Sequence, residues 1–260
     1  MGIKTAITKD ELPQKYKGFN LCETQDGLTH SVYLLGNEYV LKIVEDNERT
    51  KILNEQKLLE DLEGLCVPKL LDIYTNESYT MAFYSQISGE SLSGVSDSNI
   101  KQIAHFLKEF HTKSKNLSST NKKIYEKQYL KTLIEQTNKN EFLNYFNDIN
   151  VQLQNNGVVH GDLFYDNAKF EDNNLSGVYD FIEACEGDFV FDLAVIAISW
   201  CFENDIINEN KVNVLLSAYG CKIAYTKFVE YIKYALLYYT VTRYLNNRDY
   251  KELLQRLESL

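Results

Sequence analysis

The sequence contains few prolines and histidines, and it has no excess of basic residues. Only Pro13 and Pro68 are prolines, so turns in this chain depend mainly on glycine, asparagine and aspartate. The formal net charge is −10 at pH 7. Nucleic acids and anionic membranes bind basic surfaces, so the acidic balance argues against either as the main partner. It is better suited to a cationic or zwitterionic small molecule.

Paired cysteines and long apolar segments are also absent. The five cysteines are odd in number and widely spaced, and no Cys-x-x-Cys pair occurs, which favours free thiols in a reducing compartment. The longest apolar segment, near residues 194–200, is too short to span a membrane. Residues 1–4 (MGIK) do not have the pattern of a secretory signal, and Ala6 stands where myristoylation prefers Ser or Thr. We therefore predict a cytoplasmic protein.

The N-terminal part of the chain has the pattern of short strands. Ser31–Leu35 and residues 39–44 are rich in strand-forming residues, and Gly36-Asn37 between them is suited to a hairpin turn. Residues 46–62 have apolar side chains at helical spacing. Residues 79–84 predict another strand.

From about residue 96 the pattern becomes helical. The exceptions are short strands predicted at residues 158–159 and 175–179. Helices are predicted near residues 100–110, twice within 125–153, and near 194–200, 212–219 and 228–245. This order predicts an α+β fold in which a strand-rich part precedes a larger helical part, with a hinge near residues 85–89.

Two segments in the second half carry polar residues in an informative pattern. Residues 158–167 are VVHGDLFYDN, and residues 177–181 are GVYDF. Phosphoryl transfer from a nucleotide uses one Asp to orient the attacking hydroxyl and accept its proton, while Asn and Asp side chains hold magnesium ions on the phosphates. We therefore predict that Asp162 is the catalytic base and that Asn167 and Asp180 are metal ligands.

Two other interpretations of these residues remain open. Asp and Asn are common in loops because they bind local backbone groups, so Asp162 and Asn167 could serve loop structure alone. His160 and Asp162 could instead be ligands in a two-metal hydrolase. Such sites usually contain several histidines, and none of the other three in this chain lies at ligand spacing from His160.

Lys42 is a charged residue inside an apolar strand segment, YVLKIV. Burying its ammonium group costs free energy unless a negative partner is present. Glu55 poses the same problem on the apolar face of the next predicted helix, so a Lys42–Glu55 pair accounts for both. Such a strand lysine can contact the α- and β-phosphates of a nucleotide. The alternatives are a lysine that faces water and a helix phase that differs by one residue.

The His-Gly-Asp motif, the Asn five residues after its Asp, and the strand that ends in Asp-Phe resemble the catalytic segment of kinase-like phosphotransferases that act on small molecules. These include aminoglycoside phosphotransferases, choline kinases and kinase-fold homoserine kinases. The resemblance covers nearly the whole chain and implies a bilobal, protein-kinase-like fold. Residues 1–86 would be a nucleotide-binding lobe with a small antiparallel sheet and one helix. Residues 87–260 would be a mostly helical lobe for catalysis and substrate binding, with ATP and Mg²⁺ as cofactors.

The same resemblance assigns supporting roles to four residues. It places residues 27–31 (GLTHS) in the loop over the phosphates, where the hydroxyls of Thr29 and Ser31 would bind phosphate oxygens. An ordinary turn is the alternative, because this loop has one glycine. Asp192 would brace the catalytic loop, although its place at the start of a buried helix also suits a helix cap. His160 is expected to hold the loop rather than to contact substrate.

The segment between Asp180 and Asp192 favours a small acceptor over a protein. It is short and lacks the Ala-Pro-Glu end of a protein-kinase activation segment. Its three carboxylates could hold an ammonium group of the acceptor or could be solvated loop charges. These candidate substrate-binding residues are Glu183, Glu186 and Asp188.

Residues 158–246 resemble the homoserine kinases of this fold most closely, through segments such as LSGVYDF and FDLA. Lys42 and Gly161 follow the broader superfamily instead, and the N-terminal part resembles choline kinases. Homoserine is therefore the first predicted acceptor, followed by choline or another amino alcohol and then an aminoglycoside. A nucleotide-binding scaffold without catalysis is the non-enzymatic alternative. Such a scaffold would be expected to lack one of the key residues, and all four are present: Lys42, Asp162, Asn167 and Asp180.

Overall fold

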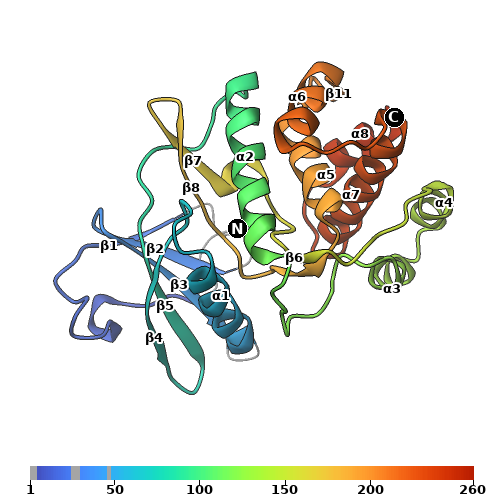
Figure 1. The fold of residues 1–260 in the computed structure, drawn as a ribbon. Helices are drawn as coiled ribbons and strands as arrows, with labels where there is room; N and C mark the ends of the chain where they lie inside the picture. The colour runs from blue at the N-terminus through green and yellow to red at the C-terminus, as the bar shows by residue number, and fades with distance from the viewer. Residues whose placement is uncertain (1–4, 25–29, 46–47) are drawn as a thin grey trace. The chain divides into compact units, whose positions relative to one another are not determined.

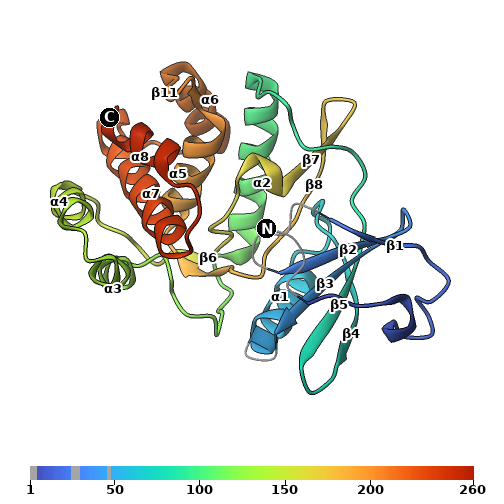
Figure 2. The ribbon, with the colours of Figure 1, turned by 180° about the vertical axis from the view of Figure 1, so that it is seen from behind.

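The computed structural model describes residues 5–24, 30–45 and 48–260. The chain forms two compact units (Figures 1 and 2), one made of Met1–Ser88 and Ser176–Ile182 and the other of Gly89–Leu175 and Glu183–Leu260. The first unit thus includes a late segment, Ser176–Ile182, that the predicted division at residue 86 did not assign to it. No helix within the described ranges combines the length and apolar character needed to cross a bilayer.

The first unit is built on a five-stranded antiparallel sheet, in the order β1-β2-β3-β5-β4. The strands predicted at residues 31–35, 39–44 and 79–84 are confirmed as the three central ones. The sequence patterns had not indicated the two edge strands. The bounds are β1 (Leu21–Glu23), β2 (Ser31–Leu35), β3 (Tyr39–Glu45), β4 (Leu70–Thr75) and β5 (Tyr79–Ser85).

One face of the sheet carries an apolar cluster, and the unbroken burial of β5 shows that the other face is covered there as well. Along β2 buried and partly buried residues alternate, as expected for a strand with one covered face. Tyr16, from the segment before the sheet, is fully buried and stacks on Phe83 of β5 with ring centroids 3.8 Å apart. Helix α1 (Arg49–Asp61) contacts β5, and its buried residues include Ile52 and Glu55. The predicted helix phase is therefore confirmed.

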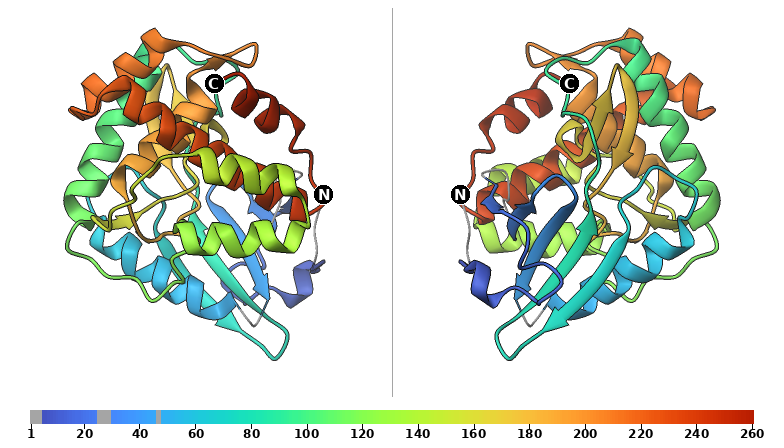
Figure 3. Two further views of the ribbon diagram at one scale, coloured as in Figure 1. Left: turned by 90° about the vertical axis from the view of Figure 1, so that its right-hand side faces the viewer. Right: turned by 90° about the vertical axis from the view of Figure 1, so that its left-hand side faces the viewer.

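The second unit is mainly helical (Figure 3), and the predicted helices are confirmed. Helix α5 is buried along nearly its whole length, which explains its continuous apolar sequence. It contacts α6 and α7, while α2 packs against α6, and α3 and α4 both contact α7. The bounds are α2 (Asp97–Ser114), α3 (Lys127–Thr137), α4 (Asn140–Asp148), α5 (Phe189–Trp200), α6 (Glu209–Tyr219), α7 (Tyr225–Leu245) and α8 (Lys251–Glu258).

Short strands flank the loop that contains Asp162. Strand β6 (Gly157–Val159) precedes the loop and pairs with β9 (Cys185–Gly187). The short 3-10 helix η3 (Tyr165–Asn167) ends the loop, and β7 (Ala168–Glu171) and β8 (Asn174–Val178) form a hairpin. A further hairpin, β10 (Phe202–Glu203) with β11 (Ile206–Ile207), follows α5.

Candidate active site

In the first unit, Lys42 lies between two carboxylates. It is on β3, opposite Val32 on one neighbouring strand and Ala82 on the other, so it occupies the centre of the sheet rather than an edge. Its Nζ is 2.7 Å from Asp180 Oδ1 and 4.0 Å from Glu55 Oε1. The residue is buried. The structure therefore brings Lys42 and Glu55 together and adds Asp180 as the nearer partner.

Glu55 is buried and accepts hydrogen bonds from two other groups. Its Oε2 accepts from the Tyr84 hydroxyl at 2.7 Å, and its Oε1 accepts from the Phe181 backbone N–H at 3.1 Å. Burial raises the pKa of Glu55, and the charge of Lys42 opposes that shift. The carboxylate therefore ties helix α1 both to strand β5 and to the backbone next to Asp180.

Asp180 has an unusual backbone conformation. Its φ is +68°, in the left-handed region that non-glycine residues seldom occupy, although Asp tolerates it better than most. Its side chain is 37% exposed. The preceding chain is tied down by a 2.9 Å hydrogen bond from Val178 N–H to the Cys66 carbonyl. Asp180 is thus held in a fixed turn with one carboxylate oxygen on Lys42.

The predicted phosphate-covering loop is described only in part. Thr29, with Gly27 and Leu28, lies outside the described residues. Ser31 is buried at the start of β2, and its hydroxyl oxygen accepts a 2.8 Å hydrogen bond from the Thr5 backbone N–H. The Ser31 hydroxyl therefore helps to hold the N-terminal segment on the sheet.

In the second unit, Asn167 is locked onto Asp162. The Asn167 Nδ2 donates to the Asp162 backbone carbonyl at 2.7 Å and to its Oδ2 at 3.2 Å. Both bonds use the amide nitrogen, so the carbonyl oxygen Oδ1 is the side that can accept a cation. The Asp162 carbonyl also accepts from Phe164 N–H at 2.9 Å. Asp162 itself is half-buried, which leaves part of its side chain accessible.

Asp192 holds the start of this loop through backbone hydrogen bonds. It is fully buried in the first turn of α5, and its carboxylate accepts from His160 N–H at 2.8 Å and from Gly161 N–H at 2.6 Å. The helix cap is instead Asp188. His160 is also fully buried, and its Nδ1 accepts from Asp162 N–H at 3.2 Å. Asp192 and His160 therefore contact the backbone that positions Asp162.

His111, which the sequence patterns had not indicated, completes this network. It is buried on α2, and its Nε2 donates to Asp192 Oδ2 at 3.0 Å. Its Nδ1 lies 2.8 Å from the Tyr219 hydroxyl. Burial lowers the pKa of His111, although the bond to Asp192 opposes this shift. The sequence did carry a signal, since a histidine next to Phe110 sits on the buried face of an amphipathic helix.

Gly161 fits a space that has no room for a side chain. Its φ is +78°, and a Cβ atom there would lie 2.1 Å from the ring of Tyr125. On its other side, the Gly161 carbonyl accepts a hydrogen bond from the buried Tyr239 hydroxyl of α7. Tyr125 and Tyr239 thus enclose the residue before Asp162. No local pattern distinguishes these two from the other tyrosines of the chain, which has 19.

The three candidate acceptor carboxylates have different surroundings. Asp188 is buried, caps α5 through a 2.8 Å bond from Val190 N–H, and accepts another 2.8 Å bond from Gln154 N–H. Glu186 pairs with Lys123 at 2.8 Å, which lowers the pKa of Glu186. Glu183 is half-buried in the turn before β9. Asp188 and Glu186 therefore already bind groups of the protein itself.

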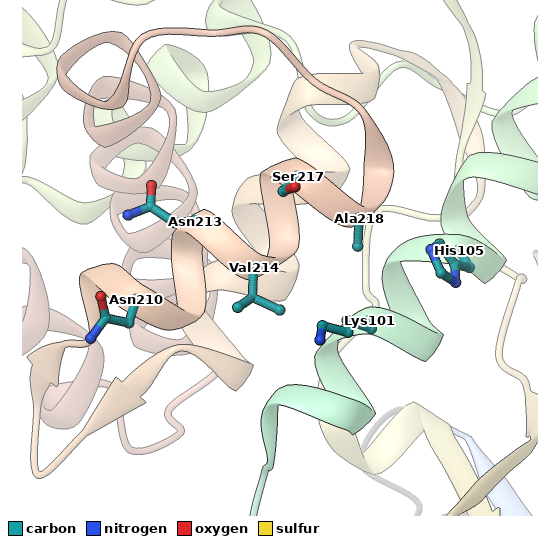
Figure 4. Close-up of a pocket in the computed structure, with 7 residues that line it drawn as sticks. All are labelled: Lys101, His105, Asn210, Asn213, Val214, Ser217 and Ala218. Atoms are coloured by element: carbon teal, nitrogen blue, oxygen red, sulfur yellow. The ribbon is translucent and has the colours of Figure 1, made fainter.

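The second unit also contains a hollow away from these residues. It has a volume of about 600 Å³ and lies between α2 and α6 (Figure 4). None of the predicted site residues lines it. Its lining residues are Lys101, His105, Asn210, Asn213, Val214, Ser217 and Ala218. Within the described ranges, no three His, Cys, Asp or Glu side chains gather as a closed metal site.

This chain is similar to known proteins in both sequence and structure. Residues 21–220 match the family described as the phosphotransferase enzyme family. A homoserine kinase of Azorhizobium caulinodans is 50% identical over 64 residues, which are 24% of this chain and only 20% of that protein. The homoserine kinase of Methylobacillus flagellatus is 23% identical over 247 residues, covering 84% of this chain and 77% of that protein.

Solved structures with a similar fold include aminoglycoside phosphotransferases. The GDP complex of wild-type aminoglycoside 2'-phosphotransferase-IIIa has a TM-score of 0.69 and 17% identity, covering 92% of this chain and 91% of that one. The streptomycin–ATP complex of APH(2")-IIa has a TM-score of 0.61 and 17% identity, covering 94% and 92%. At these identities the likeness concerns the fold, which is the protein-kinase-like fold predicted from the sequence.

Proposed function

Because this chain belongs to the phosphotransferase enzyme family, we propose that it transfers the γ-phosphoryl group of ATP to a hydroxyl of a small metabolite, with Mg²⁺ as cofactor. The observation that carries the proposal is the locked pair of Asp162 and Asn167. The double hydrogen bond from Asn167 holds a carboxylate and a carboxamide oxygen in fixed positions on one loop. Phosphoryl transfer needs little covalent chemistry from the protein but depends strongly on positioning.

Each proposed role follows from the chemistry of the side chain. Asp162 orients the acceptor hydroxyl and accepts its proton. Lys42, whose ammonium already lies among carboxylates, binds the α- and β-phosphates, and Glu55 holds Lys42 in place. Asn167 and Asp180 offer hard oxygen ligands of the kind that Mg²⁺ prefers when it is shared with phosphates. Bound Mg²⁺ would neutralise charge on the phosphates during transfer.

The remaining assignments concern support and acceptor binding. Asp192 and His160 keep the loop backbone in place, which is supported by their bonds to residues 160–162. Thr29 and Ser31 stay proposed phosphate contacts on the evidence of the sequence. Glu183, Glu186 and Asp188 stay the proposed candidates to bind an ammonium group of the acceptor, on the evidence of the sequence.

Homoserine is the proposed acceptor. It is supported by the short segment that is 50% identical to a homoserine kinase and by the longer alignment at 23%. Choline or another amino alcohol is the alternative, and aminoglycosides are the third class, since proteins of similar fold were solved with kanamycin and streptomycin. All three classes carry a cationic nitrogen group, which agrees with the acidic net charge of this chain.

A coupled ADP-release assay tests the proposal. The purified protein is incubated with MgATP or MgGTP and each of homoserine, choline, ethanolamine, simple sugars and aminoglycosides. We expect ADP release that depends on both homoserine and Mg²⁺, with O-phosphohomoserine detected by mass spectrometry. A protein that binds MgATP but releases no ADP, whichever acceptor is added, would instead be the nucleotide-binding scaffold. Preference for choline or an aminoglycoside would retain the phosphotransferase and replace the acceptor.

A further inference from the structure

Arg243 lies beside the loop that carries Asp162, within the second unit. It is in the last turns of α7, and its guanidinium carbon is 5.8 Å from the ring centroid of Phe164, two residues after Asp162. One turn earlier on the same helix, the Tyr239 hydroxyl donates to the Gly161 carbonyl. Residues four apart in a helix share one face. This face of α7 therefore contacts Gly161 and Phe164, which lie before and after Asp162 in the loop.

A second arginine in the same unit has a guanidinium whose donors are bound by protein oxygens. Arg256 lies over the Phe202 ring, with its guanidinium carbon 5.1 Å from the centroid. It also pairs with Asp205 at 3.0 Å, donates to the Ile198 carbonyl at 2.9 Å, and pairs with Glu252. Arg256 thus has an aromatic ring beneath it and three oxygen acceptors around it.

Arg243 also lies over an aromatic ring, but among the described residues it lacks oxygen acceptors like those around Arg256. Its guanidinium lies over the Phe164 ring. In the described part of the chain, it makes neither a hydrogen bond nor an ion pair. The residue is half-buried. A guanidinium has five donors in a planar fork that matches the two oxygens of a carboxylate. Leaving those donors unused at a partly buried position costs free energy, so the geometry fits an external anion.

The charges of Asp162 and Arg243 both reach the same buried phenol. Burial raises the pKa of Tyr239 well above its ordinary value, the Asp162 charge raises it further, and the Arg243 charge opposes these effects. Both charges therefore act on Tyr239, which agrees with the contacts that α7 makes with Gly161 and Phe164.

We infer that Arg243 binds the carboxylate of an amino-acid acceptor whose hydroxyl is held by Asp162. This inference rests on the proposed function and narrows it, because it separates homoserine from the alternatives. Homoserine has a hydroxyl and a carboxylate at the two ends of a short carbon chain, whereas choline and aminoglycosides have no carboxylate. Arg243 is then a specificity-determining residue for an acceptor that carries a carboxylate.

The kinetic test compares L-homoserine with 3-aminopropan-1-ol, the same molecule without its carboxylate. Arg243→Met should lower kcat/KM for homoserine about ten- to a hundredfold, mainly through KM, since a charge-assisted bond is lost. Arg243→Lys keeps the positive charge but loses the planar arrangement of donors. Its kcat/KM for homoserine should lie between those of the wild type and Arg243→Met. Neither variant should change the weak use of 3-aminopropan-1-ol or the KM for MgATP.

Three kinetic results would overturn the inference. One is an unchanged kcat/KM for homoserine in Arg243→Met. Another is an equal loss with homoserine and 3-aminopropan-1-ol, which would mean that Arg243 supports the loop. The third is a raised KM for MgATP, which would place the guanidinium on a phosphate. Arg256→Met is the matched control: it should lower the melting temperature and leave the KM for homoserine unchanged.

Calorimetric titration of L-homoserine into the wild-type protein and Arg243→Met separates this inference from the proposed function. Binding that is lost in Arg243→Met, in a protein that releases no ADP, would retain the carboxylate site and refute the kinase. Absence of homoserine binding in the wild type would overturn the carboxylate site. ADP release with choline alone would also overturn it, while the phosphotransferase would stand.

Discussion

The proposed site residues of the first unit are held by side-chain charges, whereas those of the second unit are held through backbone. Lys42 contacts both carboxylates, with its Nζ 2.7 Å from Asp180 and 4.0 Å from Glu55. In the second unit, Asp192 and Tyr239 bind N–H and C=O groups of residues 160–161. These backbone bonds position the loop, and the Asp162 side chain accepts a further bond from Asn167.

This difference has a chemical meaning. Side-chain ion pairs can exchange partners when a charged ligand arrives, so the first unit is suited to accept phosphates and a cation. Backbone hydrogen bonds fix the position of the loop but leave its carboxylate able to take up a proton. Under the proposed function the first unit would bind the phosphates and the cation, and the second would position the acceptor hydroxyl. Each role can be tested separately.

The largest effect is expected from Asp162→Asn. Loss of the proposed base should lower kcat by roughly 10²- to 10⁴-fold while leaving the affinity for MgATP largely intact. The measurement is steady-state kinetics with homoserine, together with nucleotide binding by calorimetry. Asp172→Asn, in the exposed turn of the β7–β8 hairpin, is the control and should behave as wild type. Near-normal turnover in Asp162→Asn would remove the catalytic assignment.

Gly161→Ala tests whether the close packing of Tyr125 against the Gly161 backbone stabilises the loop. A methyl group would be strained at a φ of +78° and would overlap the Tyr125 ring, so a loss of roughly 2–5 kcal/mol in unfolding free energy is expected. Gly220→Ala is the control, because Gly220 also has a positive φ, of +85°, but its added Cβ would meet only Lys108 Nζ at 3.5 Å. Urea denaturation followed by fluorescence of Trp200, the single tryptophan, measures both.

Trp200 is a suitable reporter because its indole N–H donates to the Leu163 carbonyl of the same loop at 3.1 Å. Equal destabilisation by the two glycine substitutions would show that the Tyr125 contact adds nothing. A larger loss in Gly161→Ala would support the enclosed loop.

Asp180→Ala tests the exchangeable charges of the first unit. ATP should stabilise the wild type against heat by about 2–3 kcal/mol at a hundredfold excess over Kd, and only with Mg²⁺ present. The variant should lose most of that shift. Melting curves with ATP, with and without excess EDTA, measure it. The same shift in EDTA, or in Asp180→Ala, would show that the carboxylate has no part in Mg²⁺ binding.

The smallest effect concerns acid stability of the first unit. The hydrogen bond to His30, at 2.7 Å, and the pair with Lys51 lower the pKa of Glu48 to about 2. Because this pKa is depressed on folding, its stabilising effect is present above about pH 5 and disappears as the pH falls to 2. Because Glu48 is partly exposed, solvent screening reduces the effect to roughly 1 kcal/mol or less.

Glu48→Gln should therefore flatten the decrease in unfolding free energy between pH 5 and pH 2. Urea midpoints across that range, compared with wild type, measure it. An identical acid profile in the two proteins would mean that the Glu48 carboxylate does not contribute.

Sequence patterns predicted the central strands and the helices but not the edge of the sheet. Strand β4 has the sequence LLDIYT, and its burial does not alternate, so it lacks the period of two that marks a strand with one covered face. Strand β1 has only three residues. Helix α8 is short and was also missed. Such elements depend on neighbours that are distant in sequence.

The proposed site was predictable where a residue conflicted with its local pattern. Lys42 and Glu55 are charges within apolar segments, and this conflict was sufficient to pair them. The nearer contact of Lys42 with Asp180, which is 138 residues away, left no local sign. Tyr239 and Arg243 lie in a helix that is buried on most sides, so no periodic pattern distinguishes them from core residues.

Because the chain is translated from its N-terminus, the late position of Ser176–Ile182 affects when the first unit can fold. A ribosome that has released residues 1–88 has made the sheet, Lys42 and Glu55, yet neither Asp180 nor the Phe181 amide that Glu55 binds. The first unit can be completed only after Gly89–Leu175 has been translated. Until then the nascent sheet holds a buried lysine and a buried glutamate with incomplete partners. A fragment that stops at Ser88 is therefore a poor choice for expression, and a peptide that contains Ser176–Ile182 is the natural complement to add.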